Sequence, residues 1–234
     1  MNNSIINPLG HSHPYYPIGV AIPQYVSNTM DAFTLVTYFG IGVVSIFVAT
    51  YVLAIRTRPT IGTGDLLCAM WWAMCGFIHL FFEGYFSFTH TDIASRSDLF
   101  GQLWKEYSLS DSRYMTQDPF LIIMESITAF LWGPISFFIV YATVTDHSWR
   151  YPVQLFVSMG QLYGDLLYYG LFWYSEFVLG VDFSRPEKYY YWAYMVLCNA
   201  FWIVIPLCHI AYSSCTLAKT YEKVKAVGSV KKQQ

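Results

Sequence analysis

The chain carries little charge for its length. Its 234 residues are 55% hydrophobic, 20% aromatic and 12% charged, with a formal net charge of −2 at pH 7. Soluble domains carry about 25% charged residues, so this composition excludes an ordinary soluble domain. We expect no nucleic-acid partner for a chain of this composition. The composition indicates instead a protein that is surrounded by membrane lipid.

Five apolar stretches are each long enough to cross the roughly 30 Å hydrocarbon core of a bilayer as a helix. They are Phe33–Ile55, Leu66–Phe88, Phe120–Thr145, Tyr151–Tyr174 and Tyr189–Tyr212. The fourth is interrupted by Gln161, Gly164 and Asp165. No internal repeat divides the chain, so we expect one all-α fold, a five-transmembrane-helix bundle of residues 33–212. Residues 1–32 precede it, and residues 213–234 follow it as a basic tail.

The basic residues indicate how this bundle is oriented. With five spans the termini lie on opposite sides, and positive charge gathers on the cytosolic side. Eight basic residues fall on the side of the C-terminus: Arg56, Arg58, Arg150, Lys219, Lys223, Lys225, Lys231 and Lys232. Five fall on the other side: Arg96, Lys105, Arg113, Arg185 and Lys188. Because residues 1–32 contain four prolines and no Lys or Arg, we expect a luminal N-terminal segment without a cleavable signal peptide.

The last four residues, Lys231 to Gln234, resemble a dilysine retrieval signal of endoplasmic reticulum membrane proteins. A lysine pair at the end of a tail is also ordinary solubilising charge. We expect the signal at Lys231 and Lys232, and therefore a multi-pass protein of the endoplasmic reticulum membrane with a cytosolic C-terminus.

The longest connection, from Thr89 to Pro119, carries a short helical pattern at Phe100–Tyr107. Connections of this length are usually functional or hold their own short elements. One interpretation is an interfacial helix that covers one mouth of the bundle, with Trp104 and Tyr107 at the level of the lipid headgroups. The other is a surface helix with no role in the chemistry.

Four of the five apolar stretches carry polar or aromatic side chains three or four residues apart, a spacing that places them on one helical face. These pairs are His79 with Glu83, Glu125 with Thr128, Gln161 with Asp165, and Asn199 with Trp202. An ionisable group at bilayer depth costs a few kcal/mol unless it faces a bundle interior or a wet cavity. Three such groups, His79, Glu83 and Glu125, therefore predict a functional cavity.

Each remaining residue also has a purely structural interpretation. Asn199 and Thr128 are typical interhelical hydrogen-bonding residues, worth about 1 kcal/mol each. Asp165 follows a glycine and is a natural acceptor for a neighbouring helix. Trp202 stands in an aromatic-rich chain, where packing is the ordinary role of such a ring.

The predicted cavity has the groups for acid–base chemistry on an apolar substrate. Two carboxyls and an imidazole can deliver a proton at one point and remove one at another, and an aromatic face can stabilise a passing cation. This equipment suits the movement of a carbon–carbon double bond through a carbocation. The sequence has no dinucleotide fingerprint and no phosphate-binding loop. With one histidine in the set, we expect neither a metal nor a cofactor.

Seven segments resemble the emopamil-binding-protein family, also called the EXPERA family. They are Cys75–Gly84 (CGFIHLFFEG), Gln102–Tyr107 (QLWKEY), Asp111–Arg113 (DSR), Met124–Thr128 (MESIT) with Leu131–Pro134 (LWGP), Gly160–Asp165 (GQLYGD) and Asn199–Trp202 (NAFW). They occur in the same order from the second predicted span to the fifth. The family consists of sterol Δ8–Δ7 isomerases of the endoplasmic reticulum and non-isomerising relatives.

The resemblance implies a five-helix membrane fold and a substrate. It implies a Δ8-sterol as substrate, no cofactor, cationic amphiphilic amines as inhibitors, a homodimer, and an association with a sterol reductase. By position it implies His79, Glu83 and Glu125 as catalytic residues. Trp202, Asn199 and Thr128 would bind substrate and stabilise the cation, and Gln161, Asp165 and Tyr107 would support them.

The implied reaction adds a proton to C9 of the Δ8 bond, forms a carbocation at C8 and removes a proton from C7. His79 with Glu83 would act at one proton-transfer point and Glu125 at the other, oriented by Asn199 and Thr128. Which pole is the acid stays open, as do the preferred sterol and an epoxide hydrolase role. The alternatives are a non-catalytic sterol- or amine-binding protein of the sigma-2 receptor type, and a proton-coupled transporter, which the absence of an inverted repeat disfavours.

Overall fold

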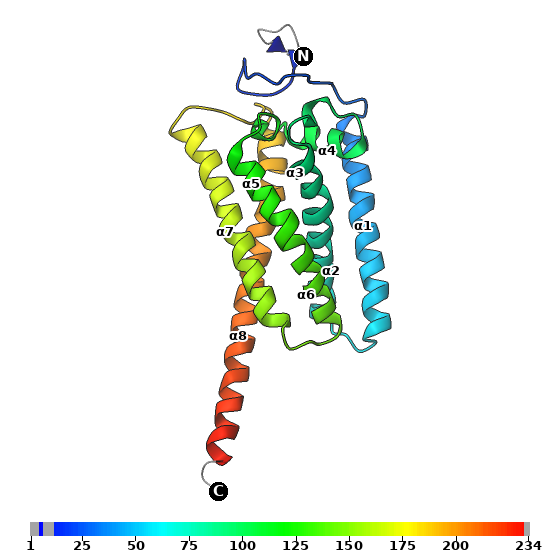
Figure 1. Cartoon of the computed structure of the whole chain (residues 1–234), viewed down its shortest axis with the longest axis vertical. Coiled ribbons are helices and arrows are strands. Elements are labelled where there is room, and N and C mark those ends of the chain that lie inside the picture. Colours follow the sequence, from blue (N-terminus) through cyan, green and yellow to red (C-terminus); the bar gives the residue numbers. More distant parts are fainter. Residues whose placement is uncertain (1–4, 7–11, 232–234) are drawn as a thin grey trace.

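Five long helical segments run side by side in the part of the chain that the computed structural model describes, residues 5–6 and 12–231. The first is α1 (Ala32–Thr57) and the fourth is α7 (Arg150–Phe177). The second joins α2 (Thr63–Phe77), η1 (Ile78–Glu83) and α3 (Gly84–Thr89). The third joins α5 (Pro119–Ile127), η4 (Thr128–Trp132) and α6 (Gly133–Val144). The fifth joins η5 (Tyr190–Cys198) and α8 (Asn199–Lys231) (Figure 1).

The predicted all-α bundle is confirmed. The described strands are only the two-residue β1 (Ile5–Ile6) and β2 (Ser12–His13), paired antiparallel outside the bundle. One predicted boundary differs clearly, because the fifth helix continues beyond Tyr212 to Lys231 and projects from the bundle (Figure 1). The residues after Tyr212 include several good helix formers and no proline, so the helix does not end where the apolar stretch ends.

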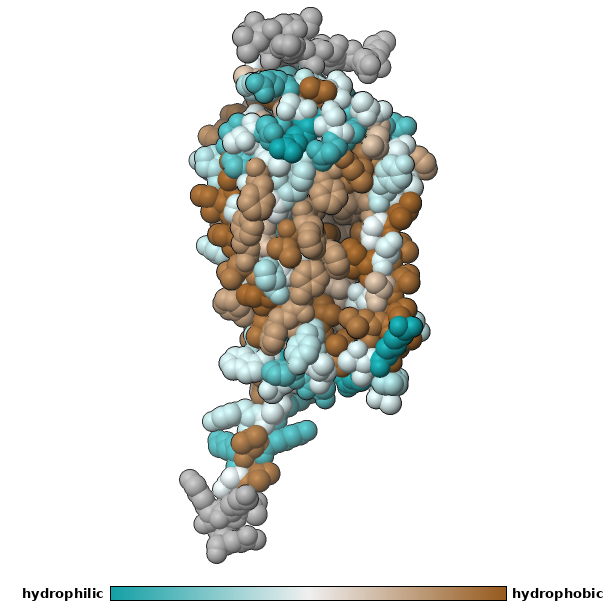
Figure 2. Space-filling view, turned by 45° about the vertical axis from the view of Figure 1, so that its right-hand side comes forward, coloured by the Kyte–Doolittle hydropathy of each residue, from teal (hydrophilic) through white to brown (hydrophobic). Residues whose placement is uncertain are grey.

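The molecule has two polar ends and an apolar middle. Figure 2 shows an apolar belt around the molecule, with polar residues gathered above and below it. Four helical segments are long and apolar enough to span a membrane: Ala32–Thr57, Thr63–Thr89, Pro119–Val144 and Tyr190–Gly228. Helix α7 has the length, 28 residues, but more polar side chains, and it packs along α8. The chain is a multi-pass membrane protein.

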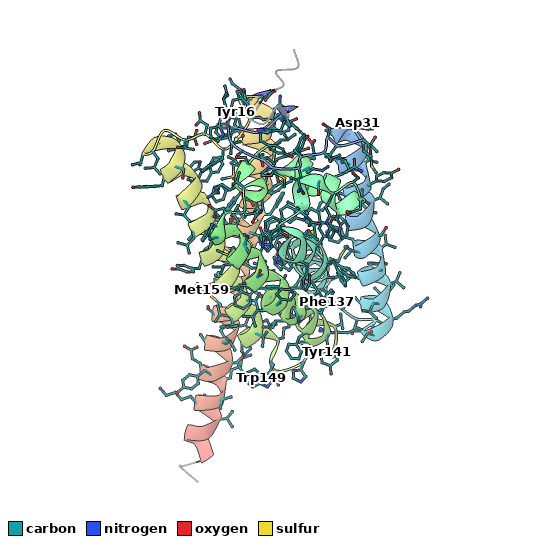
Figure 3. All side chains as sticks on the ribbon, turned by 45° about the horizontal axis from the view of Figure 1, so that its top comes forward. Tyr16, Asp31, Phe137, Tyr141, Trp149 and Met159 are labelled. Atoms are coloured by element: carbon teal, nitrogen blue, oxygen red, sulfur yellow. The ribbon has the colours of Figure 1, made fainter. Side chains whose placement is uncertain are left out.

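Aspartates begin three of the helices. Asp31 accepts a hydrogen bond from the backbone N–H of Thr34 at 2.8 Å and starts α1 (Figure 3). Asp98 does the same for α4 (Leu99–Tyr107), and Asp118, followed by a proline, does so for α5. Such caps satisfy N–H groups that a helix cannot satisfy itself. They fix where α4 and α5, which both contribute to the candidate site, begin.

Helix α4 covers one end of the bundle, as the interfacial interpretation predicted, and the N-terminal segment lies over it. Lys105 of α4 donates a 2.6 Å hydrogen bond to the Val26 carbonyl, and Tyr15 donates one to the Lys105 carbonyl. The prediction for Trp104 was wrong, because its side chain is 2% exposed and stacks on Phe82 rather than facing the lipid headgroups. The indole N–H finds its acceptor in the backbone of the bundle, the Phe82 carbonyl at 2.9 Å.

Candidate active site

A cavity of about 670 Å³ lies inside the bundle, between α1, the second and third helical segments, α4, α7 and α8. This volume falls in the range of sites that bind small molecules, roughly 300 to 1,000 Å³. All nine residues predicted for the site lie on its wall: His79, Glu83, Tyr107, Glu125, Thr128, Gln161, Asp165, Asn199 and Trp202. The rest of the wall is largely aliphatic and aromatic, which suits an apolar ligand.

His79 and Glu83 form the first polar pole of the cavity. The Nδ1 atom of His79 lies 2.7 Å from a carboxyl oxygen of Glu83, and its Nε2 atom lies 3.0 Å from the side-chain amide of Gln161 on α7. Both ring nitrogens are therefore occupied. The group of this pole that faces the cavity with spare capacity is the Glu83 carboxyl.

Glu125 forms the second pole. One of its carboxyl oxygens accepts a 2.8 Å hydrogen bond from the Tyr114 hydroxyl. Tyr114 stands next to Arg113, whose guanidinium forms a buried two-pronged ion pair with Asp111 and lies against the rings of Tyr168, Phe172 and Phe183. This ion pair fixes the loop that carries Tyr114, and so it positions the partner of Glu125.

Asn199 and Thr128 do not contact the acidic side chains that they were predicted to orient. The Asn199 amide donates to the Met195 carbonyl at 2.7 Å and to the Tyr107 hydroxyl at 3.0 Å. The Thr128 hydroxyl donates to the backbone carbonyl of Glu125 at 2.9 Å. Both residues therefore hold the wall of the cavity, and Thr128 acts on the backbone of Glu125 rather than on its carboxyl.

Trp202 lies beside the first pole. Its ring centroid is 6.3 Å from that of His79 and 5.5 Å from that of Trp71. The Trp202 indole N–H is buried without a hydrogen-bond partner among the described residues. The ring thus forms an aromatic wall next to the ionisable pair, where positive charge in a ligand would be attracted to it.

Three π-helical segments coincide with the site. His79 and Glu83 lie inside η1, Thr128 begins η4 directly after the Glu125 turn, and Asn199 follows η5. A π-helix bonds residue i to i+5 and turns its side chains differently from an α-helix, which is why such segments recur at functional sites. The residue pattern that predicts an apolar helix carries no signal for these local changes.

A close contact joins the π-helical segment η1 to the start of α6. A Cβ atom on Gly133 would lie 2.9 Å from the backbone nitrogen of Leu80, the residue after His79. Real Cβ atoms essentially never approach that closely, so only glycine fits at this position. The absence of a side chain at Gly133 therefore sets how near η1 comes to the start of α6.

The cavity wall also holds residues that were not predicted for the site, among them Tyr114 and Glu106. Tyr114 directly follows the Asp111–Arg113 motif, which was a usable signal. Glu106 precedes Tyr107 on α4 and accepts a 3.3 Å hydrogen bond from the Tyr194 hydroxyl. Burial raises the pKa of the Glu106 carboxyl. Because α4 is outside the apolar stretches, a carboxylate there gave no energetic anomaly to notice.

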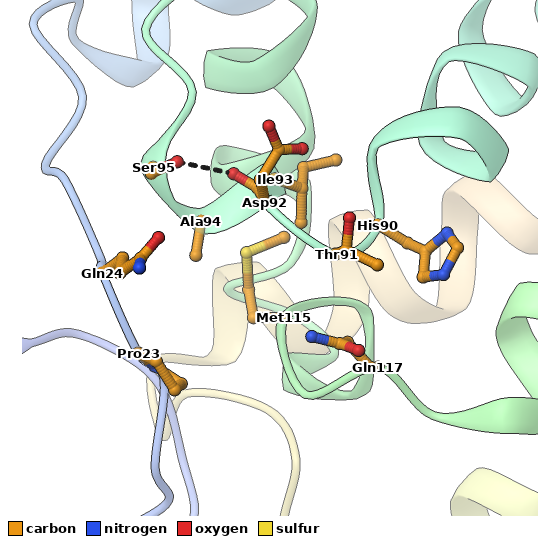
Figure 4. Close-up of a pocket in the computed structure, with 10 residues that line it drawn as sticks. All are labelled: Pro23, Gln24, His90, Thr91, Asp92, Ile93, Ala94, Ser95, Met115 and Gln117. Carbon is orange, nitrogen blue, oxygen red and sulfur yellow. Dashed lines mark hydrogen bonds between the residues drawn. The ribbon is translucent and has the colours of Figure 1, made fainter.

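A second, smaller pocket of about 150 Å³ lies near the covered end of the bundle (Figure 4). Its wall comes from the N-terminal segment and the connection after α3, including His90 and Asp92. Ser95 donates a 2.8 Å hydrogen bond to the Asp92 carbonyl beside it. None of the residues predicted for the site lies there, so the large cavity is the candidate active site.

Comparison with known proteins decides the family. Residues 99–213 match the model of the EXPERA family (EXPanded EBP superfamily). The 3-beta-hydroxysteroid-Delta(8),Delta(7)-isomerase of Rattus norvegicus is 42% identical over 196 residues, which are 83% of this chain and 84% of the relative. The chain belongs to the EXPERA family. It is an isomerase, like its mammalian relatives, which are named 3-beta-hydroxysteroid-Delta(8),Delta(7)-isomerase.

Plant members of the EXPERA family match over a similar length. A probable 3-beta-hydroxysteroid-Delta(8),Delta(7)-isomerase of Oryza sativa is 34% identical over 84% of this chain and 88% of its own. The isomeliandiol synthase ISM1 of Ailanthus altissima is 36% identical over 83% of this chain and 87% of its own. The match to the family model begins at α4, so it does not include His79 and Glu83.

Proposed function

We propose that this EXPERA protein is a sterol Δ8–Δ7 isomerase. It moves the C8=C9 double bond to C7=C8 by protonation at C9, a carbocation at C8 and deprotonation at C7. The observation that carries the proposal is the presence of two ionisable poles, His79 with Glu83 and Glu125, on the wall of one largely apolar cavity. A proton donor and a proton acceptor at separate points are what such a double-bond shift requires.

The electrons of the reaction balance without a redox partner. The π electrons of C8=C9 form the new C9–H bond, which leaves C8 cationic. The electrons of a C7–H bond then form C7=C8 as the second pole takes that proton. Substrate and product are isomers, and the enzyme gains one proton at one pole for the one it loses at the other.

At the first pole, Glu83 is the group that exchanges the proton with the sterol. His79 cannot do so directly, because Glu83 and Gln161 occupy its two ring nitrogens. His79 instead holds the second proton site of a hydrogen-bonded pair. Gln161 serves either protonation state, since its amide can present N–H to a bare Nε2 or its oxygen to a protonated one.

The cation at C8 develops in a setting that favours it. The Trp202 ring lies beside the first pole, and a desolvated cation over such a face gains about 2 kcal/mol or more. The carboxyls of both poles add fixed negative charge once they are ionised. Cationic amphiphilic amines resemble this intermediate in charge, so we propose that they bind in the same cavity and inhibit the enzyme.

We also propose the cellular setting. The bias of basic residues supports a luminal N-terminal segment and a cytosolic C-terminal end of α8, with the bundle in the membrane of the endoplasmic reticulum. Lys231 ends α8, and Lys232, the second residue of the proposed dilysine signal, lies outside the described residues. A homodimer and an association with a sterol reductase complete the proposal, on family resemblance alone.

Genetic complementation tests the proposed function. A yeast strain that lacks its Δ8–Δ7 isomerase accumulates Δ8-sterols, and expression of this chain should restore Δ7-sterols in a sterol profile. A Glu83→Gln variant expressed at the same level is the matched control and should not restore them. Accumulation of Δ8-sterols with the wild-type chain present in the membrane would contradict the proposal and favour a non-catalytic binding protein.

A further inference from the structure

Four carboxyls line the large cavity, and they differ in their partners. Glu83 is bonded to His79, Glu125 to Tyr114, and Glu106 to Tyr194. The fourth, Asp165, has no hydrogen-bond partner within residues 12–231, and its Oδ2 atom is buried. The sequence allowed Asp165 to be an acceptor for a neighbouring helix, and that interpretation was wrong.

A buried polar group without a partner costs about 1–3 kcal/mol, so proteins rarely leave one without a reason. The position of Asp165 offers a reason, because its side chain is on the cavity wall, where a ligand can supply the missing donor. The missing partner is therefore a hydrogen-bond donor on the ligand.

Asp165 lies on α7 a short distance from the first pole. Gln161, which bonds His79, lies four residues earlier, so the two levels differ by about 6 Å along the helix. In a 3β-hydroxysterol the hydroxyl lies on ring A, and the Δ8 double bond is the edge that rings B and C share. A substrate whose ring B and C edge meets the first pole therefore has a hydroxyl donor to place elsewhere on the wall.

We propose that Asp165 is the acceptor for the 3β-hydroxyl of the substrate. The inference rests on the proposed isomerase function and adds the group that sets the position of the sterol ring system relative to the two poles. Asp165 is preferred over Glu106 because Glu106 already accepts from Tyr194. In this role Asp165 binds and aligns the substrate and transfers no proton to carbon.

The test compares two substrates on purified full-length protein, a 3β-hydroxy-Δ8-sterol and its 3-deoxy analogue. The wild type should prefer the hydroxysterol by about 10- to 100-fold in kcat/KM, the range for a hydrogen bond to a charged group. Asp165→Leu keeps the branched shape and removes the acceptor. It should abolish this preference by slowing the hydroxysterol alone, while the 3-deoxy analogue keeps its wild-type kcat/KM.

Two further variants keep the inference falsifiable. Asp165→Asn retains a weaker, neutral acceptor and should lower the preference about 3- to 10-fold, which also serves if the leucine variant does not fold. Glu106→Gln is the control and should leave the ratio of the two substrates unchanged. An undiminished preference in either Asp165 variant, or an equal loss on both substrates, would overturn the assignment. Failure of the wild type to isomerise either sterol would instead overturn the proposed function.

Discussion

Two polar clusters lie inside the same bundle, and they are built differently. The cavity cluster comprises the four carboxyls at positions 83, 106, 125 and 165 with His79. The tail-side cluster comprises Arg58, Asp65, Arg150, Gln154 and Ser213, toward the end from which α8 projects. In the tail-side cluster Asp65 binds Arg150 at 2.7 Å and Arg58 at 3.0 Å, and Gln154 binds Ser213 at 2.9 Å.

The difference shows which buried polar groups indicate chemistry. The tail-side cluster balances its carboxylate with two guanidinium groups, and its members bond one another across α2, α7 and α8. The cavity cluster has an excess of acidic groups, faces open space, and leaves one carboxyl without a partner among the residues that the structure describes. Burial of a polar group is thus common to both, whereas imbalance beside a cavity distinguishes the site.

The largest expected effect is a loss of turnover on substitution of the cavity cluster. Glu125→Gln and Glu83→Gln remove a titrating group while keeping shape, so each should lower kcat by about 10²- to 10⁴-fold, the usual worth of a general acid or base. The two poles can be told apart with a substrate deuterated at C7. The variant that lacks the base should show the larger isotope effect, because removal of that proton becomes rate-limiting. Wild-type turnover in either variant would contradict its role.

The next effect concerns stability alone. Arg150 is 2% exposed, and Arg150→Met removes its ion pair with Asp65. Breaking a buried pair costs about 3–5 kcal/mol, and the low end applies here because Arg58 still binds Asp65. Thermal unfolding in detergent should therefore show a marked loss of stability, with kcat per folded molecule unchanged. A loss of kcat at full stability would mean that the tail-side cluster belongs to the site.

A smaller effect is expected at Trp202. Trp202→Leu keeps an apolar wall but removes the aromatic face beside His79, so kcat and the affinity for a cationic amphiphilic amine should each fall by about 10-fold. Trp202→Phe, which keeps a face, is the matched control and should lose less. Unchanged amine affinity in the leucine variant would count against a cation–π contact.

The smallest effect tests the covered end of the bundle, outside both clusters. Burial lowers the pKa of Lys105 to about 8, whereas an unfolded lysine titrates near 10.5. The folded state therefore disfavours the charged amine, and this penalty is progressively lost as the pH rises from about 8 toward 10.5. The free energy of unfolding should increase between pH 8 and 10, and Lys105→Met should remove that increase. A wild-type profile that falls over this range would contradict the pKa.

The sequence predicted most of the fold because its signals are energetic. Apolar length sets where helices cross lipid, and the first four helical segments begin and end within three residues of the predicted limits. It also identified His79, Glu83 and Glu125, whose presence at bilayer depth is costly. The inward orientation of Trp104 was not predictable, because an aromatic ring on an amphipathic helix suits either surface.

The wall residues outside the apolar stretches leave a weaker signal in the sequence. Tyr114 and Glu106 lie in the connection after α3, where polar residues are ordinary, and the π-helical segments leave no pattern in composition. That Asp165 has no partner in the described part of the chain can be known only once its neighbours have been placed. The energetic cost of burying a polar residue can be judged from its type, whereas its hydrogen-bond partners depend on how the whole protein packs.

One measurement tests the central claim, that two separate poles exchange protons with the sterol. Purified protein would convert a Δ8-sterol in D₂O, with the product analysed by mass spectrometry and NMR. If two poles exchange protons with the sterol, the product is a Δ7-sterol with one deuterium at C9, because the pole that donates to C9 has equilibrated with the solvent. A Δ7-sterol without deuterium at C9 would mean that hydrogen moves within the substrate, and it would contradict the separate acid and base.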